Sequence, residues 1–310
     1  MQKITLLIFL MLTTLFSFTQ KIETVYLNPA DSTADMFLAI LPENTPVKAF
    51  MFLLDGFGAS PKDVLKQTNL PEYAAKQGIL TIIPILSTGR LYFGVDSASQ
   101  ASLYHQIQGV ITKYNLQKVD FFIGGLSIGG SCAVKYAELA IKNNYPTKPK
   151  AVFGVDPPLD WERFYNEAKR IVRLSVNTTV SQEVTYMISR IEKEMKGTPK
   201  TALENFYEIS PYSVSDSTQR AIKTLINTPL MLISEPDIQW WLSQRGYDYF
   251  YINITDHAAM INELQRLGNT RAILVTTENK GYRKPNNERH PHSWSIADKE
   301  KVIHWLLTQK

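Results

Sequence analysis

Short apolar runs alternate with segments of helical periodicity along most of this chain, and this alternation limits the possible folds more than any other feature. The run at 49–54 is apolar at every position, which is typical of a strand that is covered on both faces. The alternation therefore predicts an α/β fold, with a mainly parallel sheet and helices on both of its faces. Strands are expected at 21–28, 35–42, 49–54, 79–86, 119–124, 151–155, 229–234 and 272–276, and helices at 70–77, 103–114, 131–142, 259–267 and near the C-terminus.

One long stretch, from 161 to about 213, contains no convincing strand. Apolar residues recur there at the spacing of two amphipathic helices. Because the stretch follows the strand at 151–155, we expect it to form a helical cap, at about 161–213, over the carboxyl edge of the sheet. The apolar positions are Trp161, Phe164, Tyr165, Ala168, Ile171 and Val172 in the first helix, and Val184, Met187, Ile188, Ile191 and Met195 in the second.

The first twenty residues have a different character. Lys3 precedes an apolar stretch at 4–18 that only two threonines and a serine interrupt. This pattern is typical of a secretory signal peptide, whereas a membrane-spanning helix takes about 20 apolar residues. We expect residues 1–20 to be a signal peptide and 21–310 to be the mature domain, secreted or periplasmic and without stable membrane insertion. An uncleaved membrane anchor is the alternative.

Composition excludes several classes of protein. Of the 310 residues, 44% are hydrophobic and 20% are charged, which excludes a disordered chain, a coiled coil and a multi-span membrane protein. The net charge is only +4 and no run of five like charges occurs, so nucleic acid is not an expected partner. The single cysteine, Cys132, rules out an intrachain disulfide and a multi-cysteine metal site.

The strand expected at 119–124 runs into the sequence Gly125-Leu126-Ser127-Ile128-Gly129, with a helical pattern after it. This is G-x-S-x-G between a strand and a helix, the setting that identifies a nucleophile elbow. A sharp turn presents the Ser127 hydroxyl clear of the backbone, and the helix N-terminus stabilises negative charge that develops nearby. A phosphate-binding loop would need a lysine before Ser131, and Gly130 stands there instead.

On this motif and the α/β alternation, the chain resembles a serine hydrolase of the α/β-hydrolase superfamily, of the esterase and lipase type. The resemblance covers the chain from the first expected hairpin to the last helix. It implies an eight-stranded, mostly parallel sheet and a catalytic triad in the order nucleophile, acid, histidine. It also implies a small-molecule ester substrate and no cofactor or metal.

A serine nucleophile needs a general base within hydrogen-bond reach. His290 and His292 lie in the polar loop between the last strand and the last helix, where the superfamily carries its base. We expect His292 to be the base, with His290 as the alternative. His290-Pro291-His292 as a metal pair would lack a third ligand. The last helix is expected to start with a capping box formed by Ser295 and Asp298.

The base needs an acid that holds its tautomer and stabilises the imidazolium. The strand at 229–234 ends in Glu235-Pro236-Asp237, where the superfamily usually places this acid. We expect Asp237 to be the acid. Glu235 is a near alternative, and Asp156, at the end of the preceding strand, is another, because some members carry the acid there.

The resemblance also implies an oxyanion hole made by two backbone N–H groups. One belongs to Ile128, directly after the nucleophile. The other comes from the loop Asp55-Gly56-Phe57-Gly58, with Phe57 expected and Gly58 the alternative. The longer glycine-rich loop with histidine, known from some lipases, is absent.

Three functions fit these residues. An exported serine esterase is expected. A serine peptidase of the same fold acting on short peptides, and a binding protein that has lost catalysis, are the alternatives. The sequence does not specify the acyl group, the alcohol group or the oligomeric state.

Overall fold

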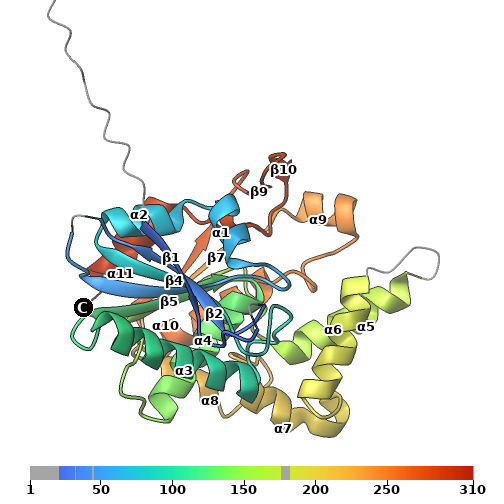
Figure 1. Ribbon diagram of the computed structural model, residues 1–310. Coiled ribbons are helices and arrows are strands. Elements are labelled where there is room, and N and C mark those ends of the chain that lie inside the picture. Colours follow the sequence, from blue (N-terminus) through green and yellow to red (C-terminus); the bar gives the residue numbers. More distant parts are fainter. Residues whose placement is uncertain (1–20, 32, 44, 176–181, 310) are drawn as a thin grey trace, which may run out of the picture.

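The computed structural model describes residues 21–31, 33–43, 45–175 and 182–309; the expected signal peptide at 1–20 lies outside these ranges. Its main sheet has eight strands within the described ranges, in the order β1-β2-β4-β3-β5-β6-β7-β8 (Figure 1). The first hairpin, β1 with β2, is antiparallel and β2 is antiparallel to β4, whereas β3 to β8 are parallel to one another. The strands are β1 Lys21–Tyr26, β2 Met36–Leu41, β3 Ala49–Leu54, β4 Ile79–Ile85, β5 Asp120–Leu126, β6 Ala151–Val155, β7 Leu230–Ser234 and β8 Ala272–Thr276.

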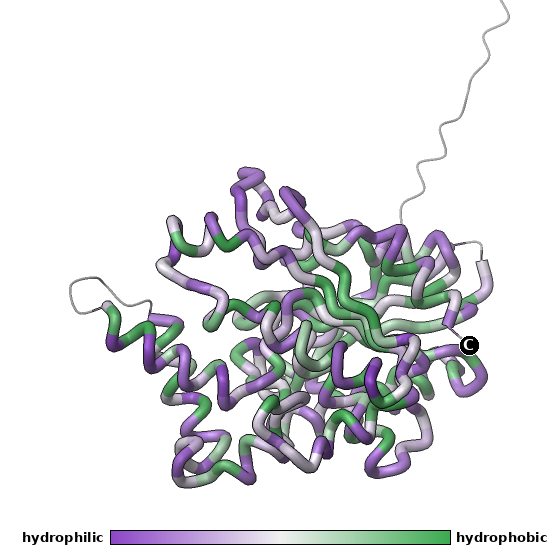
Figure 2. Tube along the Cα trace, turned by 180° about the vertical axis from the view of Figure 1, so that it is seen from behind, coloured by the Kyte–Doolittle hydropathy of each residue, from purple (hydrophilic) through white to green (hydrophobic). Residues whose placement is uncertain are grey.

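Alternate residues of the central strands enter two separate cores. In β3, Phe50 and Phe52 face one core, and Met51 and Leu53 face the other. This period of two follows from the pleat of an extended chain, and the wholly apolar strand is the consequence of burial on both sides. The prediction of an eight-stranded, mostly parallel sheet between helices is confirmed. In Figure 2 the strands form a hydrophobic band inside a more hydrophilic outer layer.

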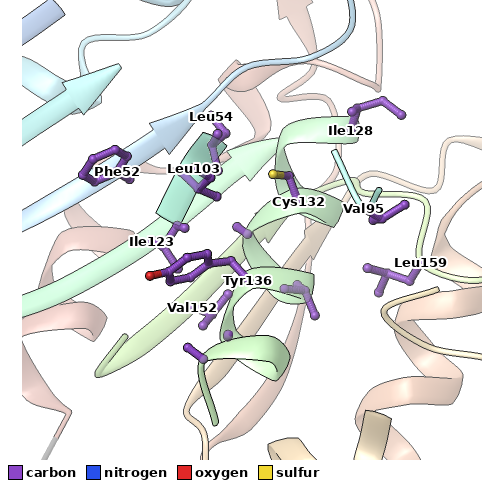
Figure 3. Packing of buried hydrophobic residues seen from close by; sticks show 14 of the residues in the cluster. Phe52, Leu54, Val95, Leu103, Ile123, Ile128, Cys132, Tyr136, Val152 and Leu159 are labelled. Carbon is purple, nitrogen blue, oxygen red and sulfur yellow. The ribbon is translucent and has the colours of Figure 1, made fainter. Parts of the chain in front are cut away.

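Helices α3, α4, α8 and α10 cover the face of Phe50, and α1, α2 and α11 cover the other (Figure 1). Figure 3 shows side chains of the strands, such as Phe52 and Ile123, packed against Leu103 of α3 and Cys132 and Tyr136 of α4. The helices are α1 Pro61–Gln67, α2 Leu70–Lys76, α3 Ser97–Tyr114, α4 Ile128–Lys142, α5 Trp161–Leu174, α6 Gln182–Glu194, α7 Pro199–Ile209, α8 Arg220–Leu225, α9 Ile238–Arg245, α10 Ile254–Arg266 and α11 Lys299–Thr308. None that the structure describes has the length and hydropathy that a membrane span needs.

Helices α5, α6 and α7 follow β6 in the stretch expected to be helical, and the ribbon shows α5 and α6 side by side at one end of the molecule (Figure 1). Asp256 of α10 holds the start of this segment in place. Its buried carboxylate accepts hydrogen bonds from the N–H groups of Leu159 and Asp160, both at 3.1 Å, and forms an ion pair with Arg163 of α5. The position of α5 beside the sheet therefore depends on a buried, fully bonded charge rather than on apolar packing alone.

The loop before the last helix differs from the prediction. It contains a short hairpin, β9 Tyr282–Arg283 with β10 Glu288–Arg289, and a 3₁₀ turn at Trp294–Ile296. Asp298 caps α11, but Ser295 accepts a hydrogen bond from the N–H of Tyr282 and donates to the carbonyl of Lys280. The predicted capping box is wrong, because Ser295 forms hydrogen bonds with the hairpin segment instead of with the first turn of α11.

Candidate active site

Strand β5 turns into α4 at Ser127, and the turn is as sharp as a nucleophile elbow requires. Ser127 has φ of 55° and ψ of −128°, a strained conformation for a residue with a side chain. The flanking glycines allow close backbone contacts. A Cβ on Gly129 would lie 2.5 Å from the carbonyl oxygen of Leu54, and one on Gly125 would lie 2.5 Å from Gly129 itself. Glycine is therefore required at both positions of the motif, because β3, β5 and α4 pack too closely there for a larger residue.

Ser127 lines a cavity of about 180 Å³ together with Ile128 and His292. The Ser127 N–H donates to the carbonyl of Val155 at 2.9 Å, which fixes the turn against β6. The side chain is only half-buried and lies at the first turn of α4, where the backbone dipole favours negative charge. The candidate nucleophile and the candidate base thus share one cavity.

His292 is oriented by a carboxylate, which belongs to Asp156. The Nδ1 atom of His292 lies 2.7 Å from Oδ2 of Asp156. Since an ionised carboxylate only accepts, Nδ1 carries the proton, and Nε2 is left as the ring nitrogen that can take a proton. The predicted base is therefore held in the tautomer that general-base chemistry needs.

Asp156 follows β6 directly and is nearly fully buried. Its Oδ1 accepts a hydrogen bond from Ser234 at 2.6 Å, and its backbone carbonyl accepts one from the Asn253 side chain. Burial by itself raises the pKa of Asp156, but the hydrogen bond and charge of His292, with smaller contributions from His257 and Ser234, bring the pKa below its ordinary value. The carboxylate is thus ionised at neutral pH and stabilises a positive imidazole.

Asp237 has a different position, and the prediction that it holds His292 is wrong. Its carboxylate accepts from the N–H of Trp240 at 3.1 Å, capping α9, and from Arg289 at 2.6 Å. Strands β6 and β7 are parallel neighbours, so residues after both reach the same edge of the sheet. The loop after β8 brings His292 to the end of β6, which makes Asp156 its partner.

Glu235, the nearer alternative, also stays away from His292. It is buried and accepts hydrogen bonds from the N–H groups of Lys280 and Gly281, and it pairs with Arg289 at 2.5 Å. Together Glu235 and Asp237 hold the loop that carries His292 through its Arg289. Both carboxylates therefore stabilise the histidine loop, and neither is hydrogen-bonded to His292 among the described residues.

His290 does not take the place of His292. Its Nδ1 accepts a hydrogen bond from the backbone N–H of His292 at 3.2 Å, and its ring packs on Trp240 at 4.8 Å between centroids. Burial, followed by the positive charge of Arg283, lowers the pKa of His290 to about 3. The ring is therefore neutral across the physiological range, and it fixes the backbone of the loop.

The loop after β3 lies against Ser127, where a second oxyanion donor is expected. A Cβ on Gly56 would be 3.5 Å from the Ser127 Cβ. The N–H of Gly58 donates to the carbonyl of Arg90 at 3.0 Å, whereas the N–H groups of Phe57 and Ile128 have no hydrogen-bond partner in the described parts of the chain. Of the two expected donors in this loop, Phe57 is the one left open to a ligand.

No protein-family model and no curated protein sequence matches the chain. Solved structures do. The chain is similar to the fluorophosphonate-binding serine hydrolase F of Staphylococcus aureus, with 15% identity, 93% of this chain and 99% of that one covered, and a TM-score of 0.55. It is also similar to carboxyl esterase 2 of Tuber melanosporum, with 15% identity, coverage of 94% and 88%, and a TM-score of 0.58. The chain has the α/β-hydrolase fold.

A further neighbour with this fold is the acylaminoacyl peptidase of Pyrococcus horikoshii, at 14% identity and a TM-score of 0.51. The match covers 89% of this chain but 38% of the peptidase. The α/β-hydrolase fold is thus common to an esterase and a peptidase that are both about 15% identical to this chain or less, and the choice between them depends on the site.

Sequence reasoning missed Asp55, which joins the oxyanion loop to the histidine loop of this α/β-hydrolase fold. Its Oδ1 accepts hydrogen bonds from the Gly56 N–H at 2.7 Å and from the indole N–H of Trp294 at 2.9 Å. Burial raises the pKa of Asp55 to about 6. The only signal in the sequence is a carboxylate directly after a wholly apolar strand.

Proposed function

We propose that the protein is a serine hydrolase that cleaves carboxylic esters, with Ser127 as nucleophile, His292 as general base and Asp156 as the acid. The single observation that supports this most is the 2.7 Å hydrogen bond between Asp156 and Nδ1 of His292, beside a serine in a strained elbow. Ser127 and His292 also line the same cavity, as a nucleophile and its base would.

The proposed reaction uses these groups in two steps. The Nε2 of His292 takes the proton of Ser127 Oγ as the oxygen attacks the ester carbonyl, and the N–H groups of Phe57 and Ile128 stabilise the oxyanion. His292 then protonates the departing alcohol, leaving an acyl group on Ser127. Water attacks the acyl carbon, His292 takes its proton and returns one to Ser127, and the carboxylic acid leaves.

Hydrolysis of short peptides is the second candidate. The similarity to an acylaminoacyl peptidase supports it, and the cavity of about 180 Å³ suits a small substrate of either kind. We rank ester hydrolysis before peptide hydrolysis, because an alkoxide leaves the tetrahedral intermediate with less help from the general acid than an amine needs. We also propose export, which the apolar stretch at 4–18 after Lys3 supports.

The test is covalent labelling with a fluorophosphonate probe, followed by turnover of 4-nitrophenyl esters and aminoacyl-naphthylamides. Ser127→Ala is expected to abolish labelling and to lower turnover by about 10⁶, as triad knockouts do. Ser97→Ala, an exposed serine in α3, is the matched control. Near-normal turnover by Ser127→Ala would contradict the proposal, and cleavage of the naphthylamides in preference to the esters would favour the peptidase. Absence of labelling and of turnover in the wild-type protein would favour a binding protein.

A further inference from the structure

Two arginines line the same cavity as Ser127 and His292. Arg245 is the last residue of α9, and Arg283 lies in β9 of the histidine loop. Neither was expected from the sequence, because they stand 38 positions apart in polar segments. They give one wall of the candidate active site a positive charge.

Arg283 lies beside the proposed base. Its Nη2 donates to the backbone carbonyl of His292 at 2.9 Å, so the guanidinium is anchored at the cavity. Its other N–H groups, and all those of Arg245, have no hydrogen-bond partner among the residues that the structure describes. A guanidinium presents five donors, and a planar anion uses two of them at once.

The described ion pairs include neither of these arginines. Arg163 and Arg289, by contrast, are each bound to carboxylates. Partial burial, followed by the positive charge of Arg245, lowers the pKa of Arg283, and the charges of Glu183, Glu288 and Asp55 oppose this only in part. No carboxylate of the described residues forms an ion pair with either arginine, so the two cations repel each other and an anionic ligand would relieve this repulsion.

Two carboxylates, those of Asp156 and Glu183, also line the cavity and oppose its positive charge. Asp156 is bound to His292 and Ser234, so its charge serves the proposed base. Glu183 comes from α6, in the helical segment after β6. Its charge lowers the local potential but leaves the donors of Arg245 and Arg283 facing the cavity.

We propose that the site prefers an ester that carries a carboxylate or a similar anionic group, which Arg245 and Arg283 bind while Ser127 attacks the carbonyl. This inference rests on the proposed function, and it adds the substrate class. The anion can sit on the acyl side or on the alcohol side of the ester, and the two arms of the test separate these cases.

The test compares matched neutral and anionic esters. For the acyl side these are 4-nitrophenyl hexanoate and mono-4-nitrophenyl adipate, and for the alcohol side 4-acetoxybenzamide and 4-acetoxybenzoate. In at least one pair kcat/KM is expected to be about tenfold higher for the anionic ester, the size of effect that one or two charge-assisted hydrogen bonds produce. The ratio is expected to fall between 0.05 and 1 M NaCl, because salt screens exposed charges.

Arg245→Gln is expected to lower the ratio of anionic to neutral kcat/KM about tenfold, and Arg245→Lys less. Arg266→Gln is the matched control, an exposed arginine on α10 that does not line the cavity, and it should keep the wild-type ratio. Circular dichroism checks folding, and the salt dependence of the wild-type ratio tests the proposal without any variant.

The outcomes separate the two proposals. Turnover that depends on Ser127 but shows equal or higher kcat/KM for both neutral esters would overturn the anion preference alone. A ratio that is insensitive to Arg245 and to salt would also overturn it. Turnover of none of the four esters, or turnover that survives Ser127→Ala, would overturn the proposed function and this inference with it.

Discussion

The pair formed by Asp156 and His292 makes a strong prediction for a change of one atom. Asp156→Asn replaces one carboxylate oxygen by an NH₂ group of similar size and removes the negative charge. The amide can keep its oxygen toward Nδ1 of His292 only if its NH₂ group points at Ser234, whose hydroxyl now donates to Oδ1 at 2.6 Å. The opposite orientation places a donor against Nδ1 and favours the wrong tautomer of the histidine.

The magnitude follows from burial and distance. The side chains of Asp156 and His292 are 9% and 20% exposed, so their interaction is poorly screened by water. Two unit charges about 4 Å apart at an effective dielectric constant of about 20 interact by about 4 kcal/mol. Loss of this energy from the imidazolium in the transition state lowers kcat by about 10³. Where the wrong tautomer also forms, the loss reaches about 10⁴, as for the corresponding aspartate in a serine protease.

The assay is steady-state turnover of one 4-nitrophenyl ester, with kcat and KM measured separately. Asp156→Asn should lower kcat and leave KM nearly unchanged, because Asp156 acts on the base rather than on the ester. Asp237→Asn is the matched control, since it is the same chemical change at the end of the next strand. It should lower kcat less than tenfold, through the hydrogen bond of Asp237 to Arg289.

The reverse result would refute this reasoning. If Asp237→Asn lost 10³ or more and Asp156→Asn stayed within tenfold of wild type, the observed pairing of Asp156 with His292 would not be the catalytic one. If both variants stayed within tenfold, neither carboxylate would stabilise an imidazolium during turnover.

Three further predictions test separate parts of the site. His292→Ala is expected to lower turnover as far as loss of the nucleophile, and His290→Ala to lower it far less, with a melting curve to check its effect on the loop; equal losses would contradict the assignment of the base. The pKa of Asp55, about 6 when folded and about 4 when unfolded, means that its stabilising contribution is complete below pH 4 and is lost as pH rises through 6. Urea unfolding should therefore show Asp55→Asn gaining up to about 3 kcal/mol on wild type between pH 4 and pH 8, and no pH-dependent gain would refute this. Gly129→Ala forces a Cβ to 2.5 Å from the Leu54 carbonyl and should destabilise the fold by about 1–3 kcal/mol or more, so an unchanged melting temperature would show that the elbow is not crowded.

The sequence alone determined the layers of the fold and the position of the elbow that carries the proposed nucleophile. Wholly apolar runs such as 49–54 are typical of strands that are covered on both faces, and the alternation with helices favours a parallel sheet. The elbow was equally clear, because Gly125 and Gly129 are local requirements of a turn between one strand and the following helix. These features depend on neighbours in the chain, so a local pattern records them.

The proposed base was determined by the sequence only in part. Chain order placed the base in the loop before α11, but two histidines two residues apart share that loop. The structure separates them by what surrounds each ring: Asp156 binds His292, and the indole of Trp240 covers His290.

Only the tertiary structure decided which carboxylate binds His292 and which residues form the charged wall of the cavity. Because β6 and β7 are parallel neighbours, Asp156 and Asp237 both reach the carboxyl edge, and order along the chain cannot tell which of them meets the histidine. The course of the loop after β8 decides it, and that course is set by the bonds of Arg289 to Asp237 and of Gly281 to Glu235. The sequence around each residue does not record contacts between residues tens of positions apart, because such contacts depend on how two separate loops are placed in the fold.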